Sequence, residues 1–507
     1  MKKLFYTLVL ISCCQLVFSQ SAKIRGVIKN NPNGKISLIR PAFAFTVGNI
    51  NLGYQGIVLD KKGAFGFSVE LPAPEIMTIN IADNTGKFFS SYNLFISPGD
   101  RLTVNASGKQ PDYTFSVTGK GADNNQLLAV NENFGIEKYY GDTLPGRAVA
   151  YLDSQYQSHQ KIVLEYIQQH HPSVNFETAW KANLQYEKLE AYFAFETNNA
   201  FRIEEAYKRN HDQWTGMRRS FLINAPLVND AALAGLKYKE FLELYLVRTK
   251  ENLWNQVEDN RAAFLQEWYG KDTAAGAKLY AEDHSNDLQQ RIIEKYFTGK
   301  TKEYLYAILI NGSLKDKDIK NLSTVYGQFR SQFPSSDYLQ IFDAPMKEIA
   351  FKQERKLSAD MQFIDPASSF KKWEEVLAFF KGKTVLVDMW GTWCGPCRED
   401  LDKHSAGIKA HFKGMPLDYL YIANHQSSAS IKTWKELIAF FNLSGYHTIA
   451  NSALTKDIME KVQIKGEGES FPTYVIIHKD GTFEQYQRMF GLDRDGLIAQ
   501  LEKVLAE

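Results

Sequence analysis

Short runs of apolar, β-branched and aromatic residues, broken by turn sequences, occupy the chain from residue 20 to residue 120. The runs include Lys35–Ile39, Phe65–Val69 and Met77–Ile81, and the turns include Asn31–Gly34, Asp60–Gly63 and Pro98–Asp100. Glycine, asparagine and proline at such turns supply the backbone angles that a chain reversal requires. Many short strands with tight reversals favour an antiparallel sandwich or a small barrel. We therefore expect a β-rich domain of unknown function over residues 20–120.

A different periodicity governs residues 121–357, where turn clusters become sparse and apolar residues recur at helical spacing. Tyr238, Phe241, Leu242, Tyr245 and Leu246 would lie on one face of a helix. The few prolines stand at expected helix boundaries, as at Pro172, Pro226 and Pro334. The pattern predicts an α-helical domain whose Tyr and Phe side chains form its core, with an aromatic-lined partner surface as the alternative.

The last segment, residues 358–507, alternates expected strands with expected helices. Thr384–Met389 has the continuous apolar pattern of a buried strand, and a helix is expected to begin near Pro396. Further strands are expected at Leu417–Ala423, Tyr474–Ile477 and Phe483–Met489, and further helices at Ile431–Phe441 and at about Asp495–Leu505. The turn Lys479–Gly481 joins the last two strands as a hairpin. This order predicts an α/β domain with a mixed sheet, and a multi-domain chain as a whole.

The N-terminus has the pattern of a secretory signal. Lys2 and Lys3 precede an uncharged apolar run, Leu4–Ser19, and the chain turns polar at Gln20. We predict a signal peptide over residues 1–19, because the run is shorter than the roughly 20 residues that a spanning helix needs. The alternative is a lipoprotein cleavage box with an acylated Cys13, which would be the protein's only attachment to a membrane. Either way, we expect an exported protein of the periplasm or cell envelope.

Composition and charge narrow the function classes. Apolar residues make up 44% of the chain and charged residues 23%, as in globular proteins. Lys plus Arg is 59 and Asp plus Glu is 58, so the net charge is +1, and without Lys2 and Lys3 it is 57 − 58 = −1. A near-neutral chain with no basic stripe lacks the electrostatic footprint of a nucleic-acid-binding protein.

Cysteine usage points to redox chemistry. Of four cysteines, two lie in the predicted signal, and only Cys394 and Cys397 remain. A Cys-x-x-Cys pair where a strand meets a helix places the first sulfur at the helix N-terminus, which favours thiolate over thiol. Cys394 should then attack a disulfide and Cys397 should resolve the mixed disulfide. The pair closes too small a loop to serve stability, and no second Cys or His pair has the spacing of a metal site.

The residues around this pair carry a family resemblance. Val385–Arg398 resembles a thioredoxin active site, and its Trp-Gly-Thr-Trp-Cys sequence, Trp390–Cys394, resembles the exported TlpA/ResA branch. Phe471-Pro472-Thr473 resembles the cis-proline loop of that family, and Gly491 resembles its late glycine. The resemblance covers about residues 358–507 and implies a thioredoxin fold with no cofactor. The β-rich front and helical middle resemble the multi-domain TlpA-like proteins of Bacteroidetes-type bacteria.

The resemblance also implies roles for two carboxylates. Asp388 stands where thioredoxins have a buried acid that accepts the proton of the resolving cysteine, and a carboxyl group in apolar surroundings has a raised pKa. Asp400 stands where ResA-type proteins carry Glu, so either acid could tune the thiols. The alternatives are a hydrogen-bonded polar residue in a strand for Asp388 and a solvated first-turn acid for Asp400.

Substrate contacts follow from the same resemblance. Trp393 should shield the cysteine pair and pack against substrate, beside Gly395 and Pro396 of the motif. Pro472 should be cis, which leaves the Phe471 backbone free to pair with a substrate strand.

The implied activity is reduction of disulfides in exported proteins, with electrons from a membrane donor of the DsbD/CcdA type. An oxidase or isomerase could use the same fold. A peroxidase is disfavoured because Cys394 lacks the sequence context of a peroxiredoxin. A binding protein whose front domains dominate is the remaining alternative.

Overall fold

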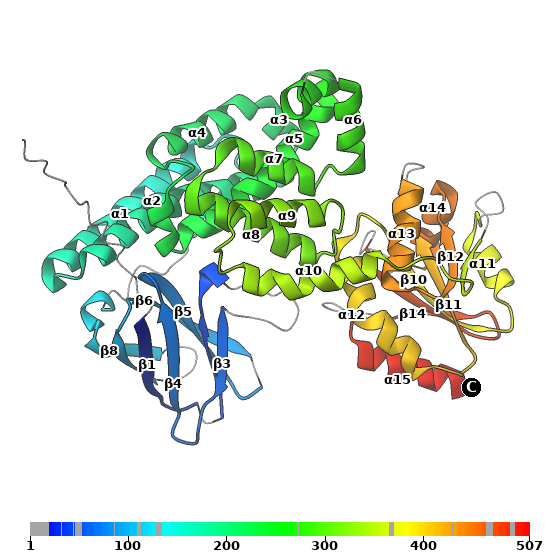
Figure 1. Ribbon diagram of the computed structural model, residues 1–507, viewed down its shortest axis with the longest axis horizontal. Helices are drawn as coiled ribbons and strands as arrows, with labels where there is room; N and C mark the ends of the chain where they lie inside the picture. The colour runs from blue at the N-terminus through cyan, green and yellow to red at the C-terminus, as the bar shows by residue number, and fades with distance from the viewer. Residues whose placement is uncertain are drawn as a thin grey trace, which may run out of the picture. The chain divides into compact units, whose positions relative to one another are not determined.

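The computed structural model describes residues 20–31, 33–43, 45, 53–85, 87–108, 113–126, 134–270, 273–364, 370–426, 430–462, 470–486 and 492–506. The predicted signal peptide, with Cys13, lies outside the described residues. The chain forms two compact units: one runs to Ala277 and includes Leu288–Tyr306, and the other comprises Lys278–Asp287 and Ala307–Glu507 (Figure 1). Helices of the predicted middle domain belong to both units, and the domain limits drawn from the sequence remain a prediction.

The first unit begins with two four-stranded sheets. One has the strand order β4-β1-β7-β8 and the other β3-β2-β5-β6. The strands are β1 Gln20–Ile28, β2 Lys35–Ile39, β3 Tyr54–Val58, β4 Ala64–Leu71, β5 Glu75–Ala82, β6 Phe88–Ile96, β7 Arg101–Gly108 and β8 Tyr113–Lys120. Ile24 and Phe67 of the first sheet share one core with Leu38 and Ile79 of the second. The sequence left a sandwich and a small barrel open, and the structure has two sheets that share a core; the expected antiparallel pairing fails between β1 and β7, which run parallel.

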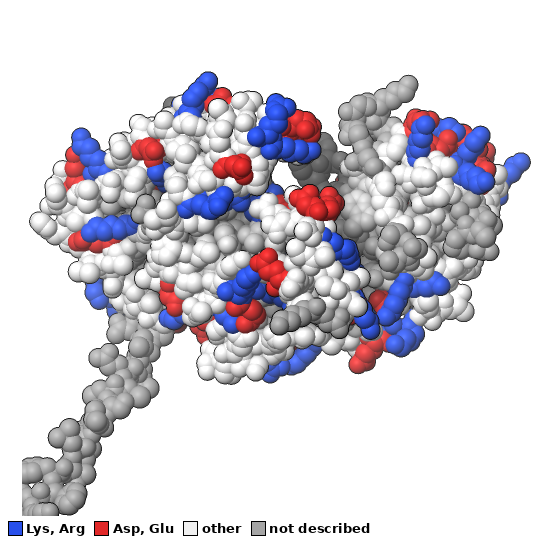
Figure 2. Space-filling model, turned by 90° about the horizontal axis from the view of Figure 1, so that it is seen from above, with Lys and Arg blue, Asp and Glu red and all other residues white. Residues whose placement is uncertain are grey.

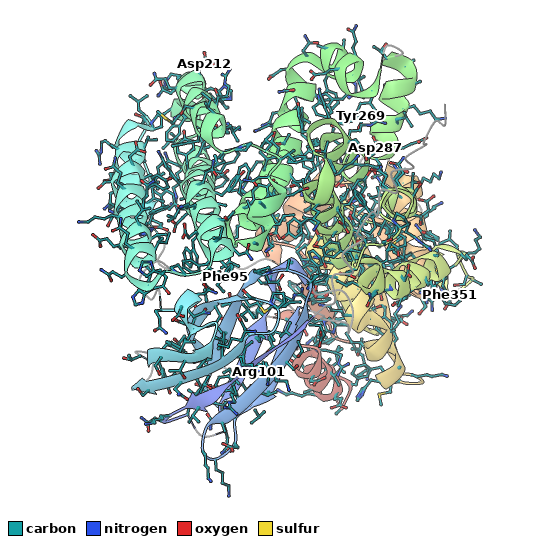
Figure 3. The ribbon with its side chains drawn as sticks, turned by 60° about the vertical axis from the view of Figure 1, so that its left-hand side comes forward. Phe95, Arg101, Asp212, Tyr269, Asp287 and Phe351 are labelled. Atoms are coloured by element: carbon teal, nitrogen blue, oxygen red, sulfur yellow. A yellow bond between two sulfur atoms is a disulfide. The ribbon has the colours of Figure 1, made fainter. Side chains whose placement is uncertain are left out.

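Helices follow the sandwich. They are α1 Gly146–His170, α2 Val174–Ile203, α3 Glu205–Arg209, α4 His211–Asn224, α5 Lys237–Tyr269, α6 Thr273–Glu282, α7 Asn286–Tyr296, α8 Gly299–Lys315, α9 Leu322–Gln332 and α10 Leu339–Gln353. Tyr238, Phe241, Leu242 and Leu246 are fully buried and Tyr245 is half-buried, so four of the five residues of the predicted stripe lie in the core. Phe95 of β6 points toward the helices (Figure 3). Its ring packs edge to face against that of Phe176 of α2, with 5.6 Å between the ring centroids.

The last part of the chain builds a six-stranded mixed sheet with the order β14-β13-β10-β11-β12-β9. Its strands are β9 Met361–Phe363, β10 Thr384–Trp390, β11 Leu417–Ala423, β12 Gly445–Ile449, β13 Thr473–Ile477 and β14 Phe483–Tyr486. Its helices are α11 Trp373–Phe379, α12 Gly395–His411, α13 Ile431–Phe441, α14 Ser452–Lys461 and α15 Arg494–Ala506. β10 runs parallel to β11 and antiparallel to β13. The predicted α/β domain with a mixed sheet is confirmed.

Burial on both faces explains why β10 reads as one apolar run. Val385, Val387 and Met389 enter the core on one face of the sheet, whereas Leu386 enters the core on the other. Asp388 alternates onto the same face as Leu386, because successive strand residues point to opposite sides. The central strand therefore carries one acid directly into an apolar layer.

The elements expected from the sequence of the last part of the chain differ in places from those of the structure. β14 ends at Tyr486, and the rest of the predicted strand, together with Gly491, lies outside the described residues. Strands β9 and β12 and helices α11 and α14 were not predicted. In the described part of the chain, no helix is long and apolar enough to cross a membrane. Figure 2 shows basic and acidic side chains interspersed on the face that it displays.

Candidate functional site

Cys394 is the N-cap of helix α12. Strand β10 ends at Trp390 and α12 begins at Gly395, so the sulfur lies at the junction between the strand and the helix. The Cys397 amide donates a hydrogen bond to Sγ of Cys394 at 3.2 Å. Pro396 lies in the first turn, where its missing N–H costs no helical hydrogen bond. The sulfur thus occupies the place that a capping oxygen holds in other helices.

The two cysteines are joined by a disulfide, with their Cα atoms 5.3 Å apart. Cys394 is 4% exposed and Cys397 is 1% exposed, so both sulfurs are shielded in this oxidised state. On reduction, an amide donor and the positive end of the helix dipole would act on Cys394 first, and both favour its thiolate. The two sulfurs therefore differ in their surroundings, and the nucleophilic role of Cys394 and the resolving role of Cys397 remain predictions.

Asp388 and Asp400 line one small cavity. Asp388 lies on β10 and Asp400 on α12, and they are 6% and 8% exposed. The Tyr474 hydroxyl of β13 donates to Oδ2 of Asp400 at 3.4 Å. The solvated first-turn interpretation of Asp400 is wrong, because the helix turns this side chain inward toward the sheet. The structure brings together both carboxylates that the resemblance singles out.

Charged groups surround this cavity. Burial lowers the pKa of Lys409, on α12, to about 7, and the charges of Asp360 and Asp388 oppose that fall. Its ammonium donates to the Ser444 carbonyl oxygen at 2.6 Å. Burial also lowers the pKa of His404, which lines the cavity, while Asp400 opposes the effect. Two basic side chains of α12, His404 and Lys409, thus lie close enough to the two acids to interact with their charges.

Aromatic side chains form the open side of the site. Trp393 is 52% exposed, and its indole Nε1 donates to the Asn424 carbonyl oxygen at 3.1 Å. Its ring centroid lies 5.7 Å from that of Phe471 and 6.1 Å from that of His425. The Phe471–Pro472 peptide bond is cis, as the sequence predicts. These rings offer an apolar surface beside the sulfurs, and substrate binding by them remains a prediction.

The sequence reasoning missed Lys409 and His425. A lone lysine in a helix usually faces solvent, so no local signal marks Lys409 as part of the site. His425 follows strand β11, which runs parallel to β10 and ends at the same edge. Residues after neighbouring parallel strands gather at that edge, and this rule would have found His425. Among the described residues, no group of three or more His, Cys, Asp or Glu side chains is placed to hold a metal ion.

No known protein-family model matches the chain. Solved structures similar to part of it include a thiol:disulfide interchange protein of the thioredoxin family from Chlorobium tepidum TLS, which is 19% identical over 25% of this chain and 83% of that chain, with a TM-score of 0.21. The thioredoxin domain of a thiol-disulfide oxidoreductase from Bacteroides vulgatus is 23% identical over 25% and 84%, with a TM-score of 0.21. A secreted Mycobacterium tuberculosis disulfide oxidoreductase, homologous to E. coli DsbE, is 16% identical over 25% and 85%, with a TM-score of 0.20.

Proposed function

We propose that this chain is a thiol–disulfide oxidoreductase that reduces disulfides of exported proteins. One observation carries the proposal: Sγ of Cys394 caps helix α12 and accepts the Cys397 amide hydrogen, while the buried Asp388 lies on β10, the strand that leads into the motif. A structural crosslink needs neither the helix N-terminus nor the acid. The helix N-terminus favours the thiolate of one sulfur, and an acid can take the proton that the other sulfur loses, so both features suit a disulfide that cycles.

The exchange proceeds in two steps with balanced electrons. In the reduced protein, the Cys394 thiolate attacks one sulfur of a substrate disulfide, which forms a mixed disulfide and releases the other substrate sulfur as a thiolate. The Cys397 sulfur then attacks Sγ of Cys394, which forms the Cys394–Cys397 disulfide and releases the second substrate thiolate. Two electrons pass from the cysteine pair to the substrate.

Asp388 accepts the proton that Cys397 loses in the second step. Its side chain is buried on the face of the sheet that Leu386 also faces. Asp400 lines the same cavity and tunes the thiols together with Asp388.

Substrate approaches over the aromatic side. The exposed Trp393 ring packs against it, with Gly395 and Pro396 forming the rim at the first turn of α12. The backbone of Phe471, before cis-Pro472, pairs with an extended substrate segment by β-augmentation. Such an edge forms hydrogen bonds with the backbone of the substrate and not with its side chains, which suits an enzyme that acts on many proteins.

The cellular setting is part of the proposal. The signal-like residues 1–19 support export to the periplasm or cell envelope, with membrane attachment only if Cys13 is lipidated. The motif Trp390–Cys397 supports the TlpA/ResA type. The electrons would come from a membrane donor of the DsbD/CcdA type, because the periplasm is kept oxidising and holds no reducing buffer. Residues 20–120 and 121–357 would supply partner choice to a thioredoxin-like domain at 358–507.

The reduction potential of the Cys394–Cys397 pair tests this proposal. The mature protein is equilibrated in redox buffers and its thiols are counted by alkylation and mass shift. A potential near or below about −220 mV is expected for a reductase. A value near about −120 mV would make the protein an oxidase, and the electrons would flow the other way. The Cys397→Ala variant should trap substrates as mixed disulfides.

The binding-protein alternative makes the opposite prediction. A pair that never cycles, with partners that stay bound in dithiothreitol, would show that the redox chemistry is idle. An isomerase would instead rescue scrambled disulfides without net reduction.

A further inference from the structure

The turn after helix α8 lies against the first residue of the active-site helix. Both belong to the same compact unit, which includes Ala307–Glu507. Asp316 directly follows α8, and a Cβ placed on Gly395 would lie 3.3 Å from Cγ of Asp316 and 3.6 Å from its Oδ1. Gly395 stands between Cys394 and Pro396, so this aspartate reaches the redox motif at the one position that has no side chain.

Backbone hydrogen bonds hold Asp316 in this place. Its amide donates to the Gly312 carbonyl oxygen at 2.9 Å, and the Asp318 amide donates to the Ser313 carbonyl oxygen at 2.8 Å. The turn therefore continues the hydrogen bonding of α8. Asp316 is therefore held by the end of α8, a helix that precedes the domain with the cysteines in the chain.

Arg398, the residue after Cys397, fastens the same turn to the active-site loop. Its Nε donates to the Asp316 carbonyl oxygen at 2.7 Å, and its Nη1 donates to the Thr392 carbonyl oxygen. The side chain is buried, and burial lowers the pKa of its guanidinium while the charges of Asp318 and Asp316 oppose that effect. One side chain thus joins the loop before Cys394 to the turn after α8.

A second attachment lies further along α12. Asp402 receives Nζ of Lys352, from α10, at 2.6 Å and Nζ of Lys317, from the turn, at 2.9 Å. Burial opposes ionisation of Asp402, but the two lysines outweigh it and lower its pKa. The turn after α8 and helix α10 are therefore attached to α12 at two places, Arg398 and Asp402.

We propose that Asp316 is a positioning residue of the redox centre, whose carboxylate disfavours the Cys394 thiolate and so makes the pair a stronger reductant. The inference rests on the proposed function. A negative charge at a helix N-terminus competes with any other anion that forms there, and a thiolate is such an anion. Destabilising the thiolate destabilises the reduced form, which is the reverse of how a strongly oxidising pair is made.

Burial raises the pKa of the Asp316 carboxyl group, and charges of both signs act on it. Arg398 and Lys315 are the cations that act on it, and Asp318 and Glu399 are the anions. Of the cations, Arg398 is already bound to two carbonyl oxygens. Replacing Asp316 by Asn would keep the shape of the side chain and leave the positive charges nearer to Cys394 without their counter-charge.

The test compares Asp316→Asn with Asp337→Asn. Asp337 is an exposed acid before α10, so its replacement changes the net charge equally, away from the site. The thiolate of the reduced, mature protein is titrated by its ultraviolet absorbance, and the equilibrium with glutathione is measured in parallel. In Asp316→Asn we expect the Cys394 thiol to titrate about one pH unit lower and the equilibrium to shift several-fold toward the dithiol. Asp337→Asn should match the wild type.

The outcomes separate the two proposals. A wild-type pair that cycles, with an unchanged titration in Asp316→Asn, would overturn the role of Asp316 and leave the oxidoreductase function standing. Equal shifts in both variants would also overturn it, because they would reflect net charge alone. A wild-type pair that neither glutathione nor dithiothreitol reduces would defeat the proposed function itself. Circular dichroism of each variant checks that the fold is retained.

Discussion

The Tyr474 hydroxyl donates a hydrogen bond to Asp400 across the cavity that Asp388 also lines, with 3.4 Å between the two oxygens. This contact joins the active-site helix to the strand that pairs with β10. It explains how an acid in the first turns of a helix can be held inside the protein. The acid faces a polar partner on the sheet, which partly replaces the water that it loses.

Replacing Tyr474 by Phe should weaken the fold slightly. The ring stays in the core, but a buried carboxylate loses one donor, so we expect about 1 kcal/mol less free energy of unfolding in urea. Tyr486→Phe is a matched control, because its hydroxyl donates to the Asp493 carbonyl oxygen in an exposed setting. A Tyr474→Phe variant as stable as the wild type would show that the cavity does not depend on this bond.

Replacing Asp388 by Asn should slow the second step of exchange and spare the first. Asn cannot accept the Cys397 proton, and losing a general base typically costs on the order of a hundredfold in rate. Stopped-flow measurement of mixed-disulfide formation and decay separates the steps. Asp418→Asn, on the neighbouring strand β11, is the control acid. Equal rates of decay in Asp388→Asn and the wild type would remove Asp388 from the mechanism.

Lys409 predicts a pH dependence of stability. The unfolded lysine titrates near 10.5, whereas burial brings the folded pKa to about 7. Between these values the unfolded chain binds more protons, so stability rises with pH, by up to about 1.4 kcal/mol per pH unit. Lys409→Met should lose that rise and be more stable than the wild type near pH 7.

Urea unfolding at several values between pH 6.5 and pH 9.5 measures this slope. Lys403→Met, an exposed lysine on the same helix, should keep the slope of the wild type. Parallel curves for Lys409→Met and the wild type would mean that Lys409 keeps an ordinary pKa in the folded protein.

Replacing Trp393 by Ala should affect protein substrates more than small ones. The side chain is about half exposed, so the free energy of unfolding should change by less than about 1 kcal/mol. The loss of its contact area should lower kcat/KM for a protein disulfide by roughly tenfold. A small aromatic disulfide, which needs no extended surface, serves as the comparison. An equal loss for both substrates would indicate damage to the sulfurs rather than to substrate binding.

The sequence predicted the local parts of the site well. Strand Leu417–Ala423 and helix Ile431–Phe441 have the bounds expected from periodicity. The place of Cys394 at the head of a helix follows from a strand, a turn and a proline that are adjacent in the chain. Such features depend on neighbours in sequence, so their physical causes can be read directly from it.

The missed parts depend on tertiary proximity. Asp316 meets Gly395 from 79 positions earlier in the chain, and no periodicity marks it. Lys409 looks like any helical lysine until the sheet covers it. Strand β12 is short and holds His447, which is buried, so its pattern does not resemble an apolar strand. These contacts could not be predicted from the sequence because their partners are far apart along the chain, and not because the interactions are weak.

The allocation of residues to the two compact units restricts how the protein can be dissected. The chain changes unit after Ala277, after Asp287 and after Tyr306. Three changes mean that no single cut yields two self-contained fragments. A fragment of residues 358–507 would keep the cysteines but lack Asp316 and Lys352. Its redox behaviour would therefore be that of a site without the residues that contact α12 from the preceding helices.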